Sequence, residues 1–140
     1  MNGEVYLPGD KSVAHRAIIL ASLLNAKSKI GNIPHSQDIF TTINVLSQCG
    51  IESLIGLDSV KIFGGTFKEP QEILNCSGSG TTARLITGLL CGLNYNFCID
   101  GDDSLSKRPM GRLLEHLRQV GACLQYDGKL PIISISSGYM

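Results

Sequence analysis

The chain is organised around one stretch, Gly9-Asp10-Lys11-Ser12-Val13-Ala14-His15-Arg16. It follows an apolar segment, Val5–Leu7, that predicts a short strand, and it opens an amphipathic run, Val13–Leu24, that predicts a helix. A turn between strand and helix can hold an anion, because the first backbone N–H groups of a helix lack partners and carry the positive end of its dipole. The cations of Lys11 and Arg16 and the hydroxyl of Ser12 are then expected to lie close together at this helix start. The ordinary alternative is that Asp10 or Ser12 caps the helix and both cations are solvated.

Length and composition indicate one globular domain without an extended nucleic-acid or membrane surface. The 140 residues are 43% apolar and 17% charged, with a formal net charge of zero. This apolar share can fill a core, and a neutral chain lacks the basic excess that nucleic-acid surfaces attract. No apolar run is long enough to span a bilayer, and the first residues resemble neither a signal peptide nor a transit peptide. We therefore expect neither nucleic acid nor a membrane as a partner.

The cysteines and histidines predict neither disulfides nor a metal centre. The cysteines are odd in number, form no C-x-x-C pair and lie mostly in apolar runs: Cys49, Cys76, Cys91, Cys98 and Cys123. Such thiols are typical of buried residues in a reducing compartment, and we expect a cytoplasmic protein. No zinc-ligand spacing relates the cysteines to His15, His35 or His116, so no metal is expected. His15 could face a ligand beside Arg16, although a structural or surface role is commoner for a single histidine.

Hydrophobic periodicity and turn residues predict the remaining elements. Asp38 resembles the N-cap of a helix that ends before Gly50, which suits the left-handed position after a helix. A further helix is expected over residues 81–93, and another begins with Pro109 at its first position and ends at Gly121. A loop is expected over residues 100–107. Strands are expected over residues 28–32, 51–57, 60–63, 72–76, 95–99, 122–126 and 131–136.

The order of these elements repeats along the chain. Gly121 follows Gly50 by 71 residues, and at this offset apolar helix positions coincide: Ile39 with Met110, Ile43 with Leu114 and Leu46 with Leu117. Each unit reads β-α-β-α-β-β, over about residues 4–67 and 72–138, which predicts an α/β fold of stacked repeats sharing one core. The alternative is chance similarity between amphipathic helices, but the hairpins and glycine turns of the two units also match.

A second glycine turn occupies in the second unit the place that residues 9–16 hold in the first. It reads Cys76-Ser77-Gly78-Ser79-Gly80-Thr81-Thr82-Ala83-Arg84 and matches neither a P-loop nor a dinucleotide-binding fingerprint. A third candidate is Arg108, because a guanidinium binds phosphate or carboxylate through two parallel hydrogen bonds. The alternative for Arg108 is a surface cation. The acidic run Asp100–Asp103 lacks the pattern of a calcium loop and is interpreted as a solvated turn.

Together these blocks resemble the EPSP synthases, the 3-phosphoshikimate 1-carboxyvinyltransferases. The resemblance runs along essentially all 140 residues and is carried by Leu7-Pro8-Gly9-Asp10-Lys11-Ser12, His15-Arg16, Gly80-Thr81-Thr82 with Arg84, and Gly101-Asp102-Asp103-Ser104-Leu105-Ser106-Lys107-Arg108-Pro109-Met110. It implies transfer of the enolpyruvyl group of phosphoenolpyruvate to the 5-hydroxyl of shikimate 3-phosphate with release of phosphate, in aromatic amino acid biosynthesis. It implies no cofactor and no metal.

The same resemblance implies the roles of single residues. Lys11 contacts both substrates, Ser12 and Arg16 bind shikimate 3-phosphate, and the Gly80 backbone and Arg108 bind phosphoenolpyruvate. Thr81 lines that pocket. The family has two lobes of three β-α-β-α-β-β units each, an inside-out α/β barrel, and is about three times longer. The chain is therefore expected to be an N-terminal piece of one lobe that carries no catalytic acid or base, with the C-terminal part as its partner, and residues ahead of Lys11 belong to the other lobe in the family.

The glycine turn departs from the family pattern, and two other functions are open. The family usually has Gly-Asn where this chain has Ser77-Gly78, so a side-chain amide expected near the phosphate is absent. One alternative is the related enzyme that transfers enolpyruvyl to UDP-N-acetylglucosamine, but its block at the position of residues 11–16 differs. The other alternative is a non-catalytic anion-binding α/β domain, which would ignore both substrates.

Overall fold

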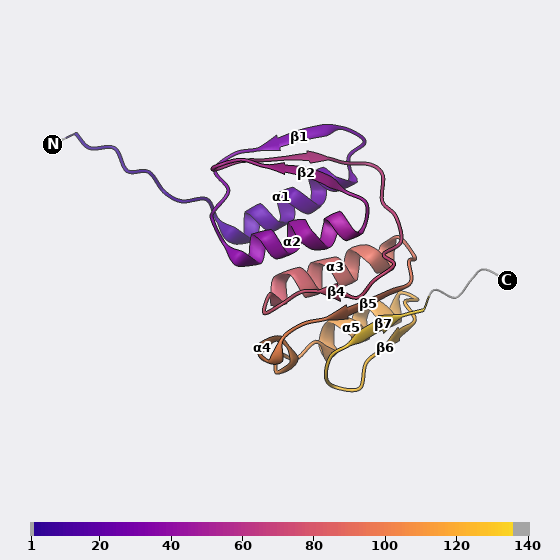
Figure 1. Ribbon diagram of the computed structural model, residues 1–140. Coiled ribbons are helices and arrows are strands. Elements are labelled where there is room, and N and C mark those ends of the chain that lie inside the picture. The colour runs from indigo at the N-terminus through magenta and orange to yellow at the C-terminus, as the bar shows by residue number, and fades with distance from the viewer. Residues whose placement is uncertain (1, 136–140) are drawn as a thin grey trace.

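The computed structural model describes residues 2–135, and in it the predicted first helix forms as α1, Lys11–Leu23 (Figure 1). Asp10 caps this helix, since its Oδ1 accepts a hydrogen bond from the Val13 N–H at 2.7 Å. Ser12, the other expected cap, lies inside the first turn. The helix buries one side, including Ile18 at 0% exposure, and leaves Leu20 62% exposed on the other. An aspartate cap therefore starts the helix two residues earlier than the apolar spacing predicted.

The first sheet has three antiparallel strands in the order β1-β3-β2, and it covers α1 and α2 (Figure 1). These elements are β1, Lys27–Ile30; α2, Gln37–Gln48; β2, Glu52–Ile55; and β3, Val60–Phe63. The central strand alternates buried Val60 and Ile62 with half-buried residues, which is the period of two that a half-covered strand requires. Gly50 follows α2 with φ +87°, so a left-handed glycine ends the helix as predicted.

The second sheet has four strands in the order β4-β5-β7-β6 and closes the other side of the molecule (Figure 1). Its first strand runs parallel to β5, because α3 connects the two, and the other pairs are antiparallel. Its elements are β4, Leu74–Asn75; α3, Gly80–Gly92; β5, Phe97–Asp100; α4, Asp103–Ser106; α5, Gly111–Gln119; β6, Leu124–Gln125; and β7, Ile132–Ser134. The α/β fold class is confirmed, while residue 136 of the last expected strand lies outside the described range.

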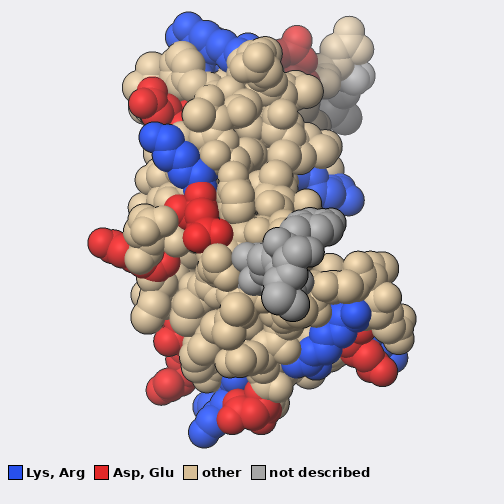
Figure 2. Space-filling model, turned by 90° about the vertical axis from the view of Figure 1, so that its right-hand side faces the viewer, with Lys and Arg blue, Asp and Glu red and all other residues tan. Residues whose placement is uncertain are grey.

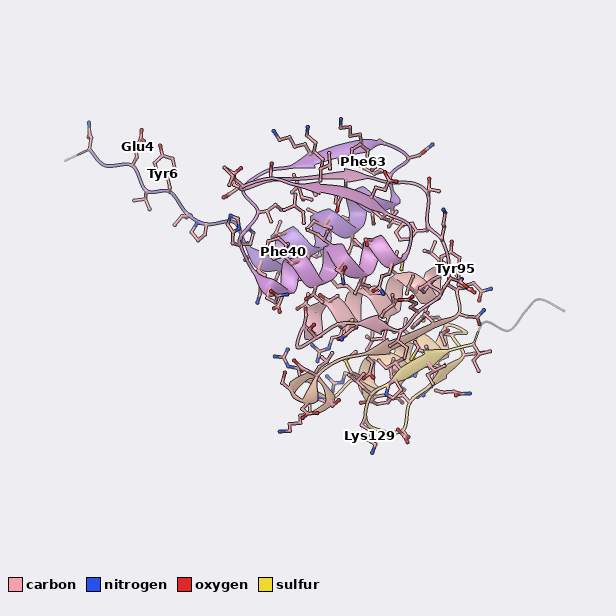
Figure 3. All side chains as sticks on the ribbon, in the orientation of Figure 1. Glu4, Tyr6, Phe40, Phe63, Tyr95 and Lys129 are labelled. Atoms are coloured by element: carbon pink, nitrogen blue, oxygen red, sulfur yellow. The ribbon has the colours of Figure 1, made fainter. Side chains whose placement is uncertain are left out.

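The strand predicted over Val5–Leu7 does not form. These residues lead away from the body of the protein, and Tyr6 is 87% exposed (Figures 1 and 3). In the second unit the corresponding strand β4 pairs with β5, but in the first unit the matching edge of β1 has no such neighbour within residues 2–135. A strand exists only through a paired backbone, so an apolar segment without a partner strand stays irregular. The first unit therefore begins with α1.

Two other helix starts and one additional helix differ from the prediction. Ser36, rather than Asp38, stands at the N-cap of α2, which leaves the Asp38 side chain in the first turn and free to bind elsewhere. The expected loop over residues 100–107 contains α4, because Asp102 Oδ1 accepts from the Leu105 N–H at 3.0 Å and caps a helical turn. The next helix, α5, begins at Gly111 instead of Pro109, since the chain first completes the end of α4.

One core runs through both units. Helices α1, α2 and α3 lie side by side and nearly parallel, and α2 contacts both neighbours (Figure 1). Fully buried side chains come from all three helices and from both sheets: Ile18, Ile39, Ile62, Leu74, Ile86, Leu90 and Ile99. This shared core is what stacked repeat units need, since each unit alone cannot cover its apolar face. Within residues 2–135, no helix is long and apolar enough to cross a membrane.

Candidate functional site

The starts of α1, α2 and α3 meet at one end of the molecule, on the left in Figure 1. Lys11 Nζ on α1 lies 2.8 Å from Asp38 Oδ2 on α2, and Thr82 Oγ1 on α3 donates to the Asp38 carbonyl at 3.4 Å. The positive ends of three helix dipoles therefore converge here, which favours bound anions. The opposite end, in Figure 2, shows scattered charges of both signs over a largely uncharged surface.

The second glycine turn is built so that two arginines cover bare backbone. Ser79 caps α3, since its Oγ accepts from the Thr82 N–H at 3.2 Å, and Gly80 follows as a buried first residue. A Cβ on Gly80 would lie 2.7 Å from Arg108 Nη1 and 3.2 Å from Arg84 Nη1. The chain thus brings together two guanidinium groups 24 residues apart in sequence, over a glycine where an added Cβ would push the Arg108 side chain aside.

The predicted cations of the first helix are exposed at the same end. Ser12 and Arg16 lie one turn apart on one face of α1. The Lys11 side chain is 51% exposed and its partner Asp38 33% exposed, so this ion pair is weak and an anionic ligand can compete for the lysine. Thr81 is half-buried beside Gly80. The carboxylate of Asp38 was missed by sequence analysis, because its position resembled an N-cap.

His15 does not face a ligand but lies in the interior, at 0% exposure. Its Nδ1 is 2.7 Å from Thr42 Oγ1, and Thr42 Oγ1 is 2.7 Å from Thr82 Oγ1. Burial lowers the pKa of His15, and Lys11 lowers it further, while the Asp38 carboxylate opposes both. The imidazole is therefore neutral at neutral pH. Nothing in the sequence singled out Thr42, since a threonine on a helix face carries no motif.

The buried neutral His15 predicts a pH-dependent stability. The folded state holds the pKa of His15 below the unfolded value of 6.5. The contribution of His15 to the free energy of unfolding is therefore complete above pH 6.5 and is lost as the pH falls below that value. His15→Asn keeps a donor near the Nδ1 position and removes the titration. We expect the free energy of unfolding to fall less between about pH 7.5 and about pH 5.5 in the variant than in the parent chain. Urea titrations at both values measure the difference, and equal falls would contradict a buried neutral imidazole.

The helix starts lie at the surface, and a hollow of about 500 Å³ borders the site at Arg84 and Pro109. A cleft of about 470 Å³ lies between the C-terminal end of α3 and α5, lined by Gly92, Asn94 and Cys123 among others. This cleft is roughly 18 Å along α3 from Gly80, at 1.5 Å of rise per residue. Within residues 2–135, no cluster of three or more histidine, cysteine or acidic side chains is arranged to hold a metal ion.

Comparisons with known proteins agree on one family. The family model described as EPSP synthase (3-phosphoshikimate 1-carboxyvinyltransferase) matches residues 1–138. Proteins named 3-phosphoshikimate 1-carboxyvinyltransferase are similar to the chain: those of Oenococcus oeni and Persephonella marina are 43% and 42% identical, each over 96% of this chain and 32% of their own length. The solved EPSP synthase from Acinetobacter baumannii superposes with a TM-score of 0.90 at 30% identity, over 96% of this chain and 32% of that one. The chain thus spans about a third of the length of these relatives.

Proposed function

The chain belongs to the EPSP synthase family, and from that premise we propose that it forms the N-terminal part of a 3-phosphoshikimate 1-carboxyvinyltransferase. Such an enzyme transfers the enolpyruvyl group of phosphoenolpyruvate to the 5-hydroxyl of shikimate 3-phosphate and releases phosphate. The remaining two thirds of the enzyme then act as the partner of this chain. Five free thiols are in keeping with a reducing compartment, and we place the activity in the cytoplasm.

The observation that carries this proposal is the bare Gly80 backbone beneath the guanidinium groups of Arg84 and Arg108. Phosphoenolpyruvate carries a phosphate and a carboxylate, and an arginine fork binds either group through two hydrogen bonds. The first N–H groups of α3 add donors at the same place. Phosphoenolpyruvate accordingly binds to Lys11, Gly80 and Arg108, with Thr81 lining its pocket.

Shikimate 3-phosphate takes the neighbouring helix start. Ser12 and Arg16 lie one turn apart on an exposed face, and Lys11 stands beside them within reach of both ligands. Two anions held side by side repel each other, and a lysine between them offsets that repulsion. The ion pair with Asp38 keeps Lys11 at the junction of α1 and α2 until substrates arrive.

This chain binds and orients the substrates, whereas proton transfer belongs to the remainder of the enzyme. A general acid or base has to come within hydrogen-bond reach of the reacting atoms. His15 is the histidine within the first substrate-binding motif, residues 9–16, but it cannot serve as the acid or base. It is fully buried and its Nδ1 is hydrogen-bonded to Thr42. The addition of the hydroxyl and the later elimination of phosphate therefore draw their acid and base from residues beyond this chain.

Gly80→Ala tests the phosphoenolpyruvate site. The test protein is a completed enzyme, in which residues 1–140 are joined to the C-terminal two thirds of the Oenococcus oeni relative. The added methyl group displaces Arg108 and crowds the ligand, while the flexible arginine spares the fold. We expect the KM for phosphoenolpyruvate to rise about 10-fold to 100-fold, which is the effect of losing one hydrogen bond to a charged group. The KM for shikimate 3-phosphate should stay nearly unchanged.

Gly88→Ala is the matched control, because Gly88 lies on the same helix and a Cβ there meets nothing within 4 Å. This control should keep both KM values and raise the melting temperature slightly, since alanine favours a helix interior. Equal increases of both KM values in Gly80→Ala would indicate a disturbed helix start instead of a ligand contact. Unchanged KM values would remove Gly80 from the site.

A further inference from the structure

A chain of buried hydroxyl groups connects the three helices that carry the site. Thr42 on α2 contacts His15 on α1 and Thr82 on α3, and Ser79 Oγ lies 2.7 Å from Thr82 Oγ1. These four side chains are between 0% and 2% exposed. The contacts join residues 27 and 40 positions apart in sequence. Each partner comes from a different part of the fold, so only the packed helices create this connection.

The directions of these hydrogen bonds follow from counting protons. When His15 Nδ1 carries the proton and donates to Thr42, the Thr42 hydroxyl donates to Thr82 and the Thr82 hydroxyl donates to the Asp38 carbonyl. Ser79 then donates to Thr82 Oγ1 and accepts from the Thr82 N–H. Every hydroxyl proton has an acceptor, and only the buried Nε2 is without a partner, as a lone pair. The other tautomer would leave a buried N–H unpaired, which costs more.

We propose that Thr42 and Thr82, together with His15, are positioning residues that set the spacing between the two anion subsites on α1 and α3. This inference rests on the proposed function for its catalytic consequence. His15 is one helical turn from Lys11, and Thr82 is two residues from Gly80. A shift of α1 against α3 therefore moves one substrate relative to the other.

Apolar packing alone does not specify this spacing sharply. Contacts between aliphatic side chains on α1, α2 and α3 are non-directional and set no preferred donor–acceptor distance between the helices. Hydrogen bonds weaken steeply with distance and angle, and in a low-dielectric interior a broken one leaves an expensive unpaired group. A displacement of about 1 Å between reacting groups can lower a rate about a hundredfold. A buried hydroxyl chain is suited to prevent such a displacement.

Thr42→Val and Thr42→Ser distinguish the role of the Thr42 hydroxyl from that of its methyl group. Valine keeps the shape and removes the hydrogen bonds, whereas serine keeps the hydroxyl and leaves a small void. In the completed enzyme, we expect Thr42→Val to lower kcat about tenfold with each KM changed less than about threefold, because each subsite stays intact on its own helix. Thr42→Ser should restore kcat to within about threefold of the parent value, even where its melting temperature is lower.

Two buried threonines serve as controls for loss of a hydroxyl. Thr41 on α2 donates only to the Gln37 carbonyl at 2.9 Å, and Thr87 on α3 donates to the Ala83 carbonyl at 2.6 Å, both within their own helices. Thr41→Val and Thr87→Val should leave kcat unchanged. A kcat that follows melting temperature across all four variants would show a purely structural role and overturn the proposal, as would an unchanged kcat in Thr42→Val.

Nuclear magnetic resonance on the 140-residue chain tests the hydrogen-bond chain without any activity. The ring nitrogens of His15 should show the proton on Nδ1, and Thr42→Val should shift the Gly80 amide signal while Thr41→Val leaves it in place. A proton on Nε2, or a Gly80 signal indifferent to Thr42, would overturn the inference. Absence of turnover in the completed parent enzyme would instead contradict the proposed function and leave this result standing.

Discussion

The 140-residue chain alone is expected to release no phosphate from a mixture of phosphoenolpyruvate and shikimate 3-phosphate. We propose that it supplies Lys11, Arg108 and the Gly80 backbone that Arg108 covers, while the acid, the base and the second lobe come from the remainder of the enzyme. Closure excludes water and aligns two anions that repel each other. Turnover should therefore be lower than that of the completed enzyme by about a thousandfold or more.

The measurement is phosphate release by the chain alone, by the C-terminal part of the Oenococcus oeni relative alone, and by the two mixed. We expect activity only in the mixture, because we propose that the two parts share the substrate site. Binding of each substrate to the chain alone should be detectable but weak. Turnover by the chain alone would contradict the proposal that this chain only binds the substrates and that the acid and base come from the remainder of the enzyme. Activity in neither the mixture nor the completed enzyme would contradict the proposed function.

Lys11→Ala and Arg16→Ala are expected to weaken shikimate 3-phosphate binding by roughly 1.5–3 kcal/mol each, the scale of a hydrogen bond to a charged group. Both side chains are exposed at the start of α1, where the helix dipole adds to their charge. Lys11→Ala should also weaken phosphoenolpyruvate binding, because we propose that this lysine contacts both substrates, whereas Arg16→Ala should spare it. Calorimetry on the completed enzyme gives both affinities.

Lys129→Ala is the control for loss of a positive charge. Lys129 lies on the exposed turn between β6 and β7, far from the helix starts (Figure 3). Its removal should leave both affinities unchanged at moderate salt, since exposed charges farther apart than the Debye length are screened. Melting temperatures should differ little among the three variants, because the Lys11–Asp38 pair is exposed and contributes little to stability. Unchanged affinities in both Lys11→Ala and Arg16→Ala would remove α1 from the site.

Only part of the site at the second glycine turn could be predicted from the sequence. The start of α3 follows from neighbouring residues, since Ser79 caps the helix by accepting from the Thr82 N–H three residues on. That Arg108 lies over this glycine depends on the path of β5 and α4, which no local pattern specifies. Family resemblance pointed to Arg108 as a ligand contact, while the residues alone left an anion contact and a surface cation both open.

Features that arise from interactions within a few residues could be predicted from the sequence. These are the long helices α1, α2, α3 and α5, the left-handed glycines Gly50 and Gly121 that follow α2 and α5, and the cations placed at helix starts. Three features depend on contacts between distant parts of the chain: Val5–Leu7 remains unpaired, His15 is buried, and Thr42 joins His15 to α3. The reason is physical: caps and turns depend on neighbouring φ, ψ and side chains, whereas strand pairing and helix rotation depend on partners dozens of residues away.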